Sequence, residues 1–260
     1  MRPDLPAAFR STPIAHRGYH DRAAGRIENS TAAIRAAVSA GYGIEIDLQP
    51  SADGQAMVFH DETLDRLTAQ TGPVAARTAA ELSAIVLSGG GEGIPTLTDV
   101  LALIDGRVPL LIEIKDQSLS LSATDVRLEA ATAAALRGYA GPVAVMSFNP
   151  ACIAHLARLA QEVPRGLTTC AFEPADWQPA TPDTCARLRD IPDYHDLGCS
   201  FVSHQATDLG RPRVADLAGQ GAAILCWTIR SVAAEAEARK IAHNITFEAY
   251  PAALSATAQA

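Results

Sequence analysis

The sequence predicts a (β/α)8 barrel (TIM barrel) with a small insertion after its second strand. Short apolar runs alternate with segments of helical periodicity, which is typical of a parallel sheet with helical connections. Eight such runs form the expected core, and the 260 residues suit a fold that typically needs about 250. An open doubly wound sheet is the alternative, and it is disfavoured because no glycine-rich phosphate turn follows the first run. We expect one domain spanning residues 1–260.

The chain begins with an irregular lead-in, followed by the first expected strand, 13–16, which stops at Arg17. A polar loop then ends in Ser30, a residue type that caps the N-termini of helices. Apolar residues at helical spacing follow, and Gly41 closes that helix. These segments form the first strand–helix unit.

The second expected strand, 43–49, alternates aliphatic and polar residues, so Glu45 and Asp47 share one face. Turn residues follow this strand, and a further apolar run at 56–59 returns the chain as a hairpin that ends in His60. The hairpin places an imidazole near two carboxylates. An amphipathic edge strand with solvated acids is the alternative interpretation of this stretch.

Residues 62–95 interrupt the alternation and are expected to form the insertion, with one helix over 78–87 and a glycine-rich loop after it. Strands and helices then alternate regularly to the end of the chain. The expected strands are 108–115, 143–148, 165–170, 199–203, 222–228 and 244–248, and the expected helices are 98–104 (capped by Thr98), 122–138, 150–163, 183–190, 212–219 and 231–242.

The composition argues against several kinds of partner. The net charge of −8 and the pI near 5.3 disfavour nucleic acid and a membrane held by electrostatics. No apolar run reaches the roughly 18 residues of a membrane span, and the N-terminus lacks the apolar region of a signal peptide. The five cysteines form no CxxC pair, so we expect neither a disulfide framework nor a zinc site. These features predict a cytoplasmic protein without stable membrane insertion, and none of them indicates an oligomeric state.

Polar residues gather where the predicted strands end. In a barrel of this kind the carboxyl ends of the strands meet at one face, where the chemistry takes place. The fold would therefore bring together residues that lie far apart in sequence. They are His16, Arg17, Glu45, Asp47, His60, Glu113, Lys115, Trp227 and Thr228.

The three acidic residues of this set predict a cation site. Glu45, Asp47 and Glu113 cannot share one pocket in ionised form without a counter-charge. A divalent cation supplies it, and ligation by carboxylate oxygens favours Mg2+ or Ca2+ over zinc.

The basic residues of the set point to a phosphate ester as the substrate. Arg17 and Lys115 can bind phosphate oxygens. His16 and His60 can supply a general base and a general acid near neutral pH. Together with a metal, these groups predict cleavage of a phosphoryl ester.

Over nearly its whole length, the sequence resembles the glycerophosphodiester phosphodiesterase family. The motifs that carry the resemblance stand in the family's order and at comparable spacing. They are Ala15-His16-Arg17-Gly18, Glu28-Asn29-Ser30, Ile44-Glu45-Ile46-Asp47, Asp53-Gly54, Val58-Phe59-His60-Asp61, Ile94-Pro95-Thr96-Leu97, Ile112-Glu113-Ile114-Lys115 and Trp227-Thr228.

The resemblance implies a hydrolase of lipid and glycerol metabolism that converts a small glycerophosphodiester into sn-glycerol 3-phosphate and an alcohol. Water or the glycerol 2-hydroxyl could be the nucleophile. The family often has Asp near the position of Glu248, so the role of that residue is open. The implied roles are His16 and His60 as the acid/base pair, Glu45, Asp47 and Glu113 as ligands of Mg2+ or Ca2+, Arg17 and Lys115 as phosphate-binding residues, and Trp227 and Phe148 as pocket residues.

Two other functions stay open. A phospholipase D-like activity on lysophospholipids or sphingolipids would need an apolar surface at the barrel mouth, and the sequence contains no amphipathic membrane helix. A non-catalytic phosphodiester-binding protein would have lost a histidine or a metal ligand, and all of these are present.

The remaining chemically interesting residues receive plainer predictions. Asp61 could be a turn residue, a residue that supports its neighbour His60, or a metal ligand, and the sequence does not decide among these roles. His204, at a strand end, is an outside candidate for the pocket rim, and Trp177 is assigned no role. The histidines expected to be structural are His20, His155, His195 and His243.

Overall fold

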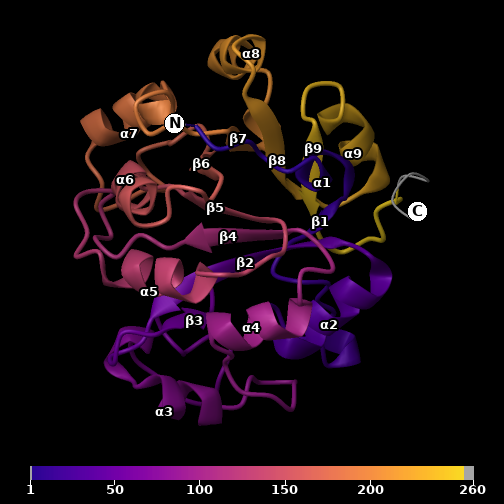
Figure 1. Cartoon of the computed structure of the whole chain (residues 1–260), viewed down its shortest axis with the longest axis vertical. Coiled ribbons are helices and arrows are strands. Elements are labelled where there is room, and N and C mark those ends of the chain that lie inside the picture. The colour runs from indigo at the N-terminus through magenta and orange to yellow at the C-terminus, as the bar shows by residue number, and fades with distance from the viewer. Residues whose placement is uncertain (1, 255–260) are drawn as a thin grey trace.

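The computed structural model, which describes residues 2–254, confirms the predicted barrel (Figure 1). Within these residues, eight parallel strands are hydrogen-bonded in the order β1-β9-β8-β7-β6-β5-β4-β2, and β1 also pairs with β2, which closes the ring. A short strand, β3 (Ala56–Val58), pairs antiparallel with β2 as the expected hairpin. The barrel strands are β1 (Ile14–Ala15), β2 (Gly43–Pro50), β4 (Leu110–Ile114), β5 (Val143–Ser147), β6 (Arg165–Thr169), β7 (Phe201–Gln205), β8 (Ala223–Ile229) and β9 (Asn244–Phe247).

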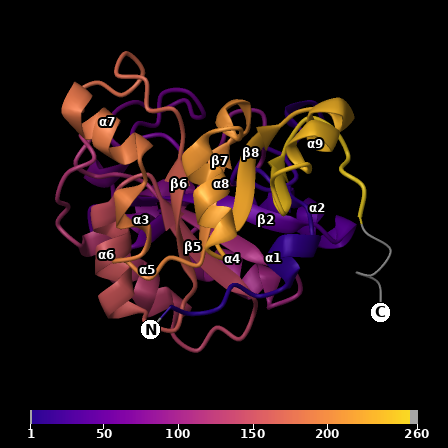
Figure 2. The same cartoon turned by 90° about the horizontal axis from the view of Figure 1, so that it is seen from above.

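Helices surround the strands (Figure 2). No helix of the described residues has the length and apolar character needed to cross a bilayer. The helices are α1 (Ala8–Ser11), α2 (Thr31–Ala40), α3 (Ala79–Ala84), α4 (Leu97–Ile104), α5 (Arg127–Leu136), α6 (Pro150–Leu159), α7 (Pro182–Arg189), α8 (Pro212–Gly219) and α9 (Val232–Ala238).

Several predicted boundaries were wrong for local reasons. Helix α4 is capped by the Thr96 hydroxyl, which accepts from Asp99 N, and not by Thr98 as predicted. Helix α5 starts only at Arg127, because the Asp116 carboxylate accepts from the backbone N–H of Ser118 and Leu121 and so stabilises a loop where the helix was expected. The other shifts are α1 inside the irregular lead-in, α3, α6 and α9 shorter than predicted, and β7 displaced by two residues.

The acidic strand is central and not an edge. Strand β2 lies between β1 and β4, and both Glu45 and Asp47 are only 2% exposed, so the interpretation as a solvated edge strand was wrong. Ile44, Ile46 and Leu48 belong to the large apolar cluster that includes residues of the outer helices. Because successive side chains of a strand alternate, the two carboxylates point into the barrel.

An apolar floor closes the barrel beneath the acidic residues. Inward-facing side chains of five barrel strands pack there with Leu5 and Phe9, and they are Ile14, Leu111, Ala144, Met146, Phe201, Ala223 and Leu225. The insertion packs separately, around Met57, Phe59 and residues of 62–95. The floor leaves the carboxyl ends of the strands as the place where polar side chains gather.

A glycine makes room for this floor. Gly166 of β6 is in register with Phe201 of β7, and a Cβ built on it would lie 2.5 Å from the buried Phe201 ring. We expect Gly166→Ala to lower the free energy of unfolding by about 1–3 kcal/mol, because the ring must move within a packed interior. Denaturant titration measures the change.

The control for this prediction is Gly210→Ala. A Cβ at Gly210 would have no heavy atom within 4 Å. We expect a change below about 0.5 kcal/mol for it. Equal stability of the two variants would contradict the packing described for the barrel floor.

Candidate active site

Three carboxylates meet at the mouth of the barrel. The pairing of β2 with β4 sets Asp47 opposite Glu113, and Glu45 lies one inward position below Asp47 on the same strand. Glu113 is 7% exposed, and the ligand oxygens of all three residues lie within 4.8 Å of one another. Two adjacent strands therefore concentrate three acids in one buried place.

Two cations partly balance these acids. Lys115 Nζ lies 2.7 Å from Asp47 Oδ1 and 2.5 Å from Glu113 Oε1. Arg17 Nε lies 3.4 Å from Asp47 Oδ2, and the Arg17 backbone N–H donates to Glu45 Oε2 at 3.0 Å. The acids are thus paired with Lys115, which follows β4, and with Arg17, which follows β1.

The pKa values of the two acids on β2 are shifted in opposite directions. Burial raises the pKa of Glu45 well above its ordinary value, and the charges of Asp47 and Glu113 raise it further. Burial would also raise the pKa of Asp47, but the charges of Lys115, His60 and Arg17 outweigh this effect and hold the Asp47 pKa well below its ordinary value. The available positive charge is therefore insufficient for three ionised carboxylates.

The backbone around these residues adopts left-handed conformations. Arg17 has φ 52° and Asn29 has φ 59°. The Asn29 amide donates to Asp47 Oδ2 at 2.9 Å, and the Asp47 N–H donates to Asn29 Oδ1 at 3.3 Å. Gly18 has φ +77°, and a Cβ there would lie 3.0 Å from Ala33 of α2. These contacts explain why the chain carries Gly and Asn beside its cationic and acidic residues.

Two histidines flank the carboxylates, and each is held by a further acid. His16 Nδ1 lies 2.5 Å from Glu248 Oε2, and His60 Nδ1 lies 2.7 Å from Asp61 Oδ1. Because carboxylates accept, each Nδ1 carries a proton and each Nε2 is left for other partners. His16 Nε2 lies 4.0 Å from Glu45 Oε2.

The acid beside His16 is itself strongly ionised. Hydrogen bonds from His16 and His20 hold the pKa of Glu248 well below its ordinary value. Burial lowers the pKa of His16, although the hydrogen bond to Glu248 opposes this effect. His16 is therefore neutral near pH 7, with an unprotonated Nε2.

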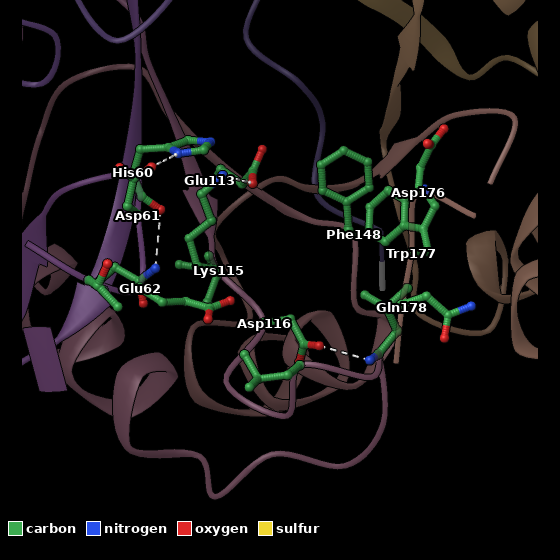
Figure 3. Close-up of a pocket in the computed structure, with 15 residues that line it drawn as sticks. His60, Asp61, Glu62, Glu113, Lys115, Asp116, Phe148, Asp176, Trp177 and Gln178 are labelled. Carbon is green, nitrogen blue, oxygen red and sulfur yellow. Dashed lines mark hydrogen bonds and ion pairs between the residues drawn. The ribbon is translucent and has the colours of Figure 1, made fainter. Parts of the chain in front are cut away.

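The site contains two adjacent cavities that share lining residues. The inner cavity, of about 180 Å3, is lined by all nine residues to which the sequence assigned roles, with Thr168, Thr228, Arg230 and Thr246. The outer cavity, of about 490 Å3, is lined on one side by His60, Glu113 and Lys115 and on the other by Phe148, Asp176 and Trp177 (Figure 3). Four residues line both cavities, namely His60, Glu113, Lys115 and Phe148. The fold thus brings the predicted residues together, while their individual roles stay predictions.

Sequence reasoning missed several contributors. Trp177 lines the outer cavity and packs on Phe148 with ring centroids 4.8 Å apart. His20 Nε2 lies 3.6 Å from Glu248 Oε2 and lines neither cavity, so the sequence missed its partner, while the expectation of a structural role for it is not contradicted. Both residues lie in loops without periodicity, and a contact across the barrel mouth leaves no signal in a single sequence.

Other residues support the site from behind, and one predicted rim residue is absent from it. Arg66 of the insertion donates to both Asp61 and Glu28, and Arg17 Nη1 donates to Glu28 Oε1 at 2.7 Å. His204 is fully buried and is bonded to Thr169 and Asp208 outside both cavities, because it occupies an outward position of β7. The structure therefore rules out His204 as the outside candidate for the rim.

The model of the glycerophosphoryl diester phosphodiesterase family matches residues 16–245. The chain belongs to this family. The resemblance predicted from the motifs is thereby confirmed.

Curated relatives match only part of their own length. The glycerophosphodiester phosphodiesterase of Caldanaerobacter subterraneus subsp. tengcongensis is 43% identical over 110 residues, which cover 39% of this chain and 44% of the relative. Glycerophosphodiester phosphodiesterase 1 of Bos taurus is 37% identical over 103 residues, which cover 36% of this chain and 30% of the relative. The aligned part is thus less than half of each relative.

Solved structures share the fold along almost the whole chain. A phosphodiesterase of Oleispira antarctica, in complex with the product sn-glycerol-3-phosphate, superposes with a TM-score of 0.73 at 24% identity, covering 92% of each chain. A glycerophosphodiester phosphodiesterase of Thermotoga maritima has a TM-score of 0.68 at 19% identity, covering 91% of this chain and 94% of the other. At these identities the likeness shows that the barrel is common to the family.

In this family member, Lys115 is a cation on which the buried acids depend. We expect Lys115→Met to lower the free energy of unfolding in the presence of chelator by about 3–5 kcal/mol, because it leaves buried carboxylates without their ammonium partner. Denaturant titration at neutral pH measures the loss.

The chain's other lysine provides the matched control. Lys240 is 66% exposed and pairs with Glu237 on the surface, so Lys240→Met should change stability by less than about 1 kcal/mol. Losses of the same size in both variants would contradict the charge balance described for the site.

Proposed function

We propose that this chain hydrolyses glycerophosphodiesters to sn-glycerol 3-phosphate and an alcohol, with a divalent cation bound by Glu45, Asp47 and Glu113. The observation that carries the proposal is the cluster of these three buried carboxylates beside Arg17 and Lys115. Family membership supports it, as does the related barrel of Oleispira antarctica in complex with sn-glycerol-3-phosphate.

The donor set fits a hard divalent cation. All three side chains offer carboxylate oxygens, which suit Mg2+ or Ca2+. The raised pKa of Glu45 marks the charge that Arg17 and Lys115 leave unbalanced. When bound, such a cation supplies Lewis-acid stabilisation of charge on the phosphate.

The cationic side chains bind and orient the phosphate. The Lys115 ammonium has three donors, and two of them are directed to Asp47 and Glu113, so one remains for a phosphate oxygen. Arg17 lines the inner cavity and is anchored through Glu28. Both residues therefore hold positive charge at a fixed place, where it stabilises the charge that develops during phosphoryl transfer.

The two histidines divide the proton transfers. His16 lines the inner cavity, and its neutral Nε2 takes a proton from the attacking oxygen, which belongs to water or to the glycerol 2-hydroxyl. His60 lines both cavities, and its Nε2 gives a proton to the leaving alkoxide. Glu248 and Asp61 hold the two rings through Nδ1.

A phospholipase D-like activity on lysophospholipids is the second candidate. Leu119, which lines the outer cavity, is 51% exposed and provides apolar surface at the mouth. The inner cavity opposes this function, because a volume of about 180 Å3 suits a small glycerol group better than one that carries an acyl chain. Lysophosphatidylcholine therefore belongs among the substrates that are tested.

The proposed reaction predicts release of glycerol 3-phosphate from glycerophosphocholine or glycerophosphoethanolamine with Mg2+ or Ca2+, and its loss in chelator. An enzyme-coupled assay of glycerol 3-phosphate measures the release. Product from lysophosphatidylcholine alone would replace the proposal by the second candidate. Unchanged turnover in chelator would contradict the role of the cation.

The histidine assignments predict that His16→Ala and His60→Ala each lower kcat by about 10²–10⁴-fold, because each removes a general acid or base. Circular dichroism should show both variants folded. His155→Ala is the control, since His155 lies on α6 and contacts Arg158 away from the site. Turnover near that of the control in both variants would refute the acid/base roles.

A further inference from the structure

We propose that the outer cavity is a subsite for a small cationic alcohol, the head group that leaves during hydrolysis. A quaternary ammonium alcohol such as choline has the matching chemistry. This inference rests on the proposed function and specifies the substrate class of the same site. Three independent features of the cavity carry it: its aromatic wall, its unpaired acids and its position relative to His60.

The aromatic wall is a packed cluster with accessible rings. Trp177 contacts Phe148 and Phe172 with ring centroids 4.8 and 4.9 Å apart, and Phe148 contacts Trp227 at 5.5 Å. Phe172 is buried and supports the other rings, while Phe148 and Trp177 are half-buried and line the cavity. Faces of Trp and Phe attract desolvated cations such as quaternary ammonium groups.

The acids of the cavity leave a negative charge available to a ligand. Asp61 is paired with Arg66, and Glu113 is paired with Lys115. Asp116 accepts hydrogen bonds from its own loop. Within residues 2–254, the exposed side chains of Glu62 and Asp176 have no hydrogen-bond or ion-pair partner. Both residues line the cavity without a cationic partner of their own, so they add negative charge to its wall, and this charge attracts a cation.

Asp176 and Trp177 stand together in the structure. Figure 3 shows both on the side of the cavity opposite His60 and Lys115, close to Phe148. A cation at the Trp177 ring would have an aromatic face beside it and the negative charge of the next residue, Asp176, nearby. This combination suits an ammonium group better than a neutral polyol, because an aromatic face attracts a cation and offers no hydrogen bond to a hydroxyl.

The position of His60 between the two cavities indicates which end of the substrate lies in each cavity. Because His60 lines both cavities, a leaving oxygen beside it has its head group in the outer cavity and its phosphate toward the carboxylates. The glycerol then occupies the inner cavity. There the hydroxyls of Thr168 and Thr246 are buried and have no partner within the described residues, so they are available to glycerol hydroxyls.

The first test compares two substrates that differ in the charge of the leaving alcohol. We expect kcat/KM for glycerophosphocholine to exceed that for glycerophosphoglycerol, and Trp177→Leu to reduce this ratio about tenfold. Asp176→Asn should reduce the ratio in the same direction. Trp177→Phe keeps an aromatic face and should largely preserve it. Asp183→Asn, on the exposed first turn of α7, is the control for loss of a surface charge.

The second test does not depend on turnover. The chain holds two tryptophans, Trp177 and Trp227, so the indole N–H signals in an NMR spectrum can be assigned with Trp177→Phe. Choline chloride should shift the Trp177 signal, whereas its neutral isostere 3,3-dimethylbutan-1-ol at the same concentration should not.

The two tests separate the subsite from the reaction. The subsite is overturned, and the proposed function stands, if the protein hydrolyses both substrates, if Trp177→Leu and Asp176→Asn leave the ratio of the two kcat/KM values unchanged, and if choline causes no specific shift. Absence of hydrolysis with a choline-specific shift at Trp177 would overturn the proposed function and support the subsite. Absence of both would overturn both.

Discussion

The arrangement of the barrel mouth depends on the burial of more negative charge than the protein itself neutralises. Register between β2 and β4 places Asp47 beside Glu113, and the period of two along β2 adds Glu45 below them. Lys115 and Arg17 compensate part of this charge, and the rest raises the pKa of Glu45. A closed barrel makes this burial unavoidable, since inward-facing side chains of adjacent strands share one interior.

The layers of the barrel follow from this constraint. Apolar side chains such as Leu111 and Phe201 fill the floor, so that water and polar groups are confined to the carboxyl ends of the strands. The histidines stand above the carboxylates and are oriented by Glu248 and Asp61. The aromatic cluster around Trp177 then adds an apolar wall to the site, on the side opposite His60 and Lys115.

Much of this arrangement could be predicted from periodicity and spacing, and the remainder depends on contacts across the barrel. Alternation along 43–49 placed Glu45 and Asp47 on one face, but only ring closure shows that this face is buried. The start of α5 was missed because the Asp116 side chain competes with a helical pattern. The contacts of Trp177 with Phe148 and of His20 with Glu248 were missed because aperiodic loops carry these residues to partners distant in sequence.

Calorimetric titration of chelator-treated protein with Mg2+ and with Ca2+ tests most directly whether the buried acids form a cation site. The account predicts one ion bound per chain by at least one of the two metals, and loss of this binding in Glu45→Gln with the fold retained. Absence of binding by both metals at millimolar concentration, or equal binding by wild type and Glu45→Gln, would contradict it.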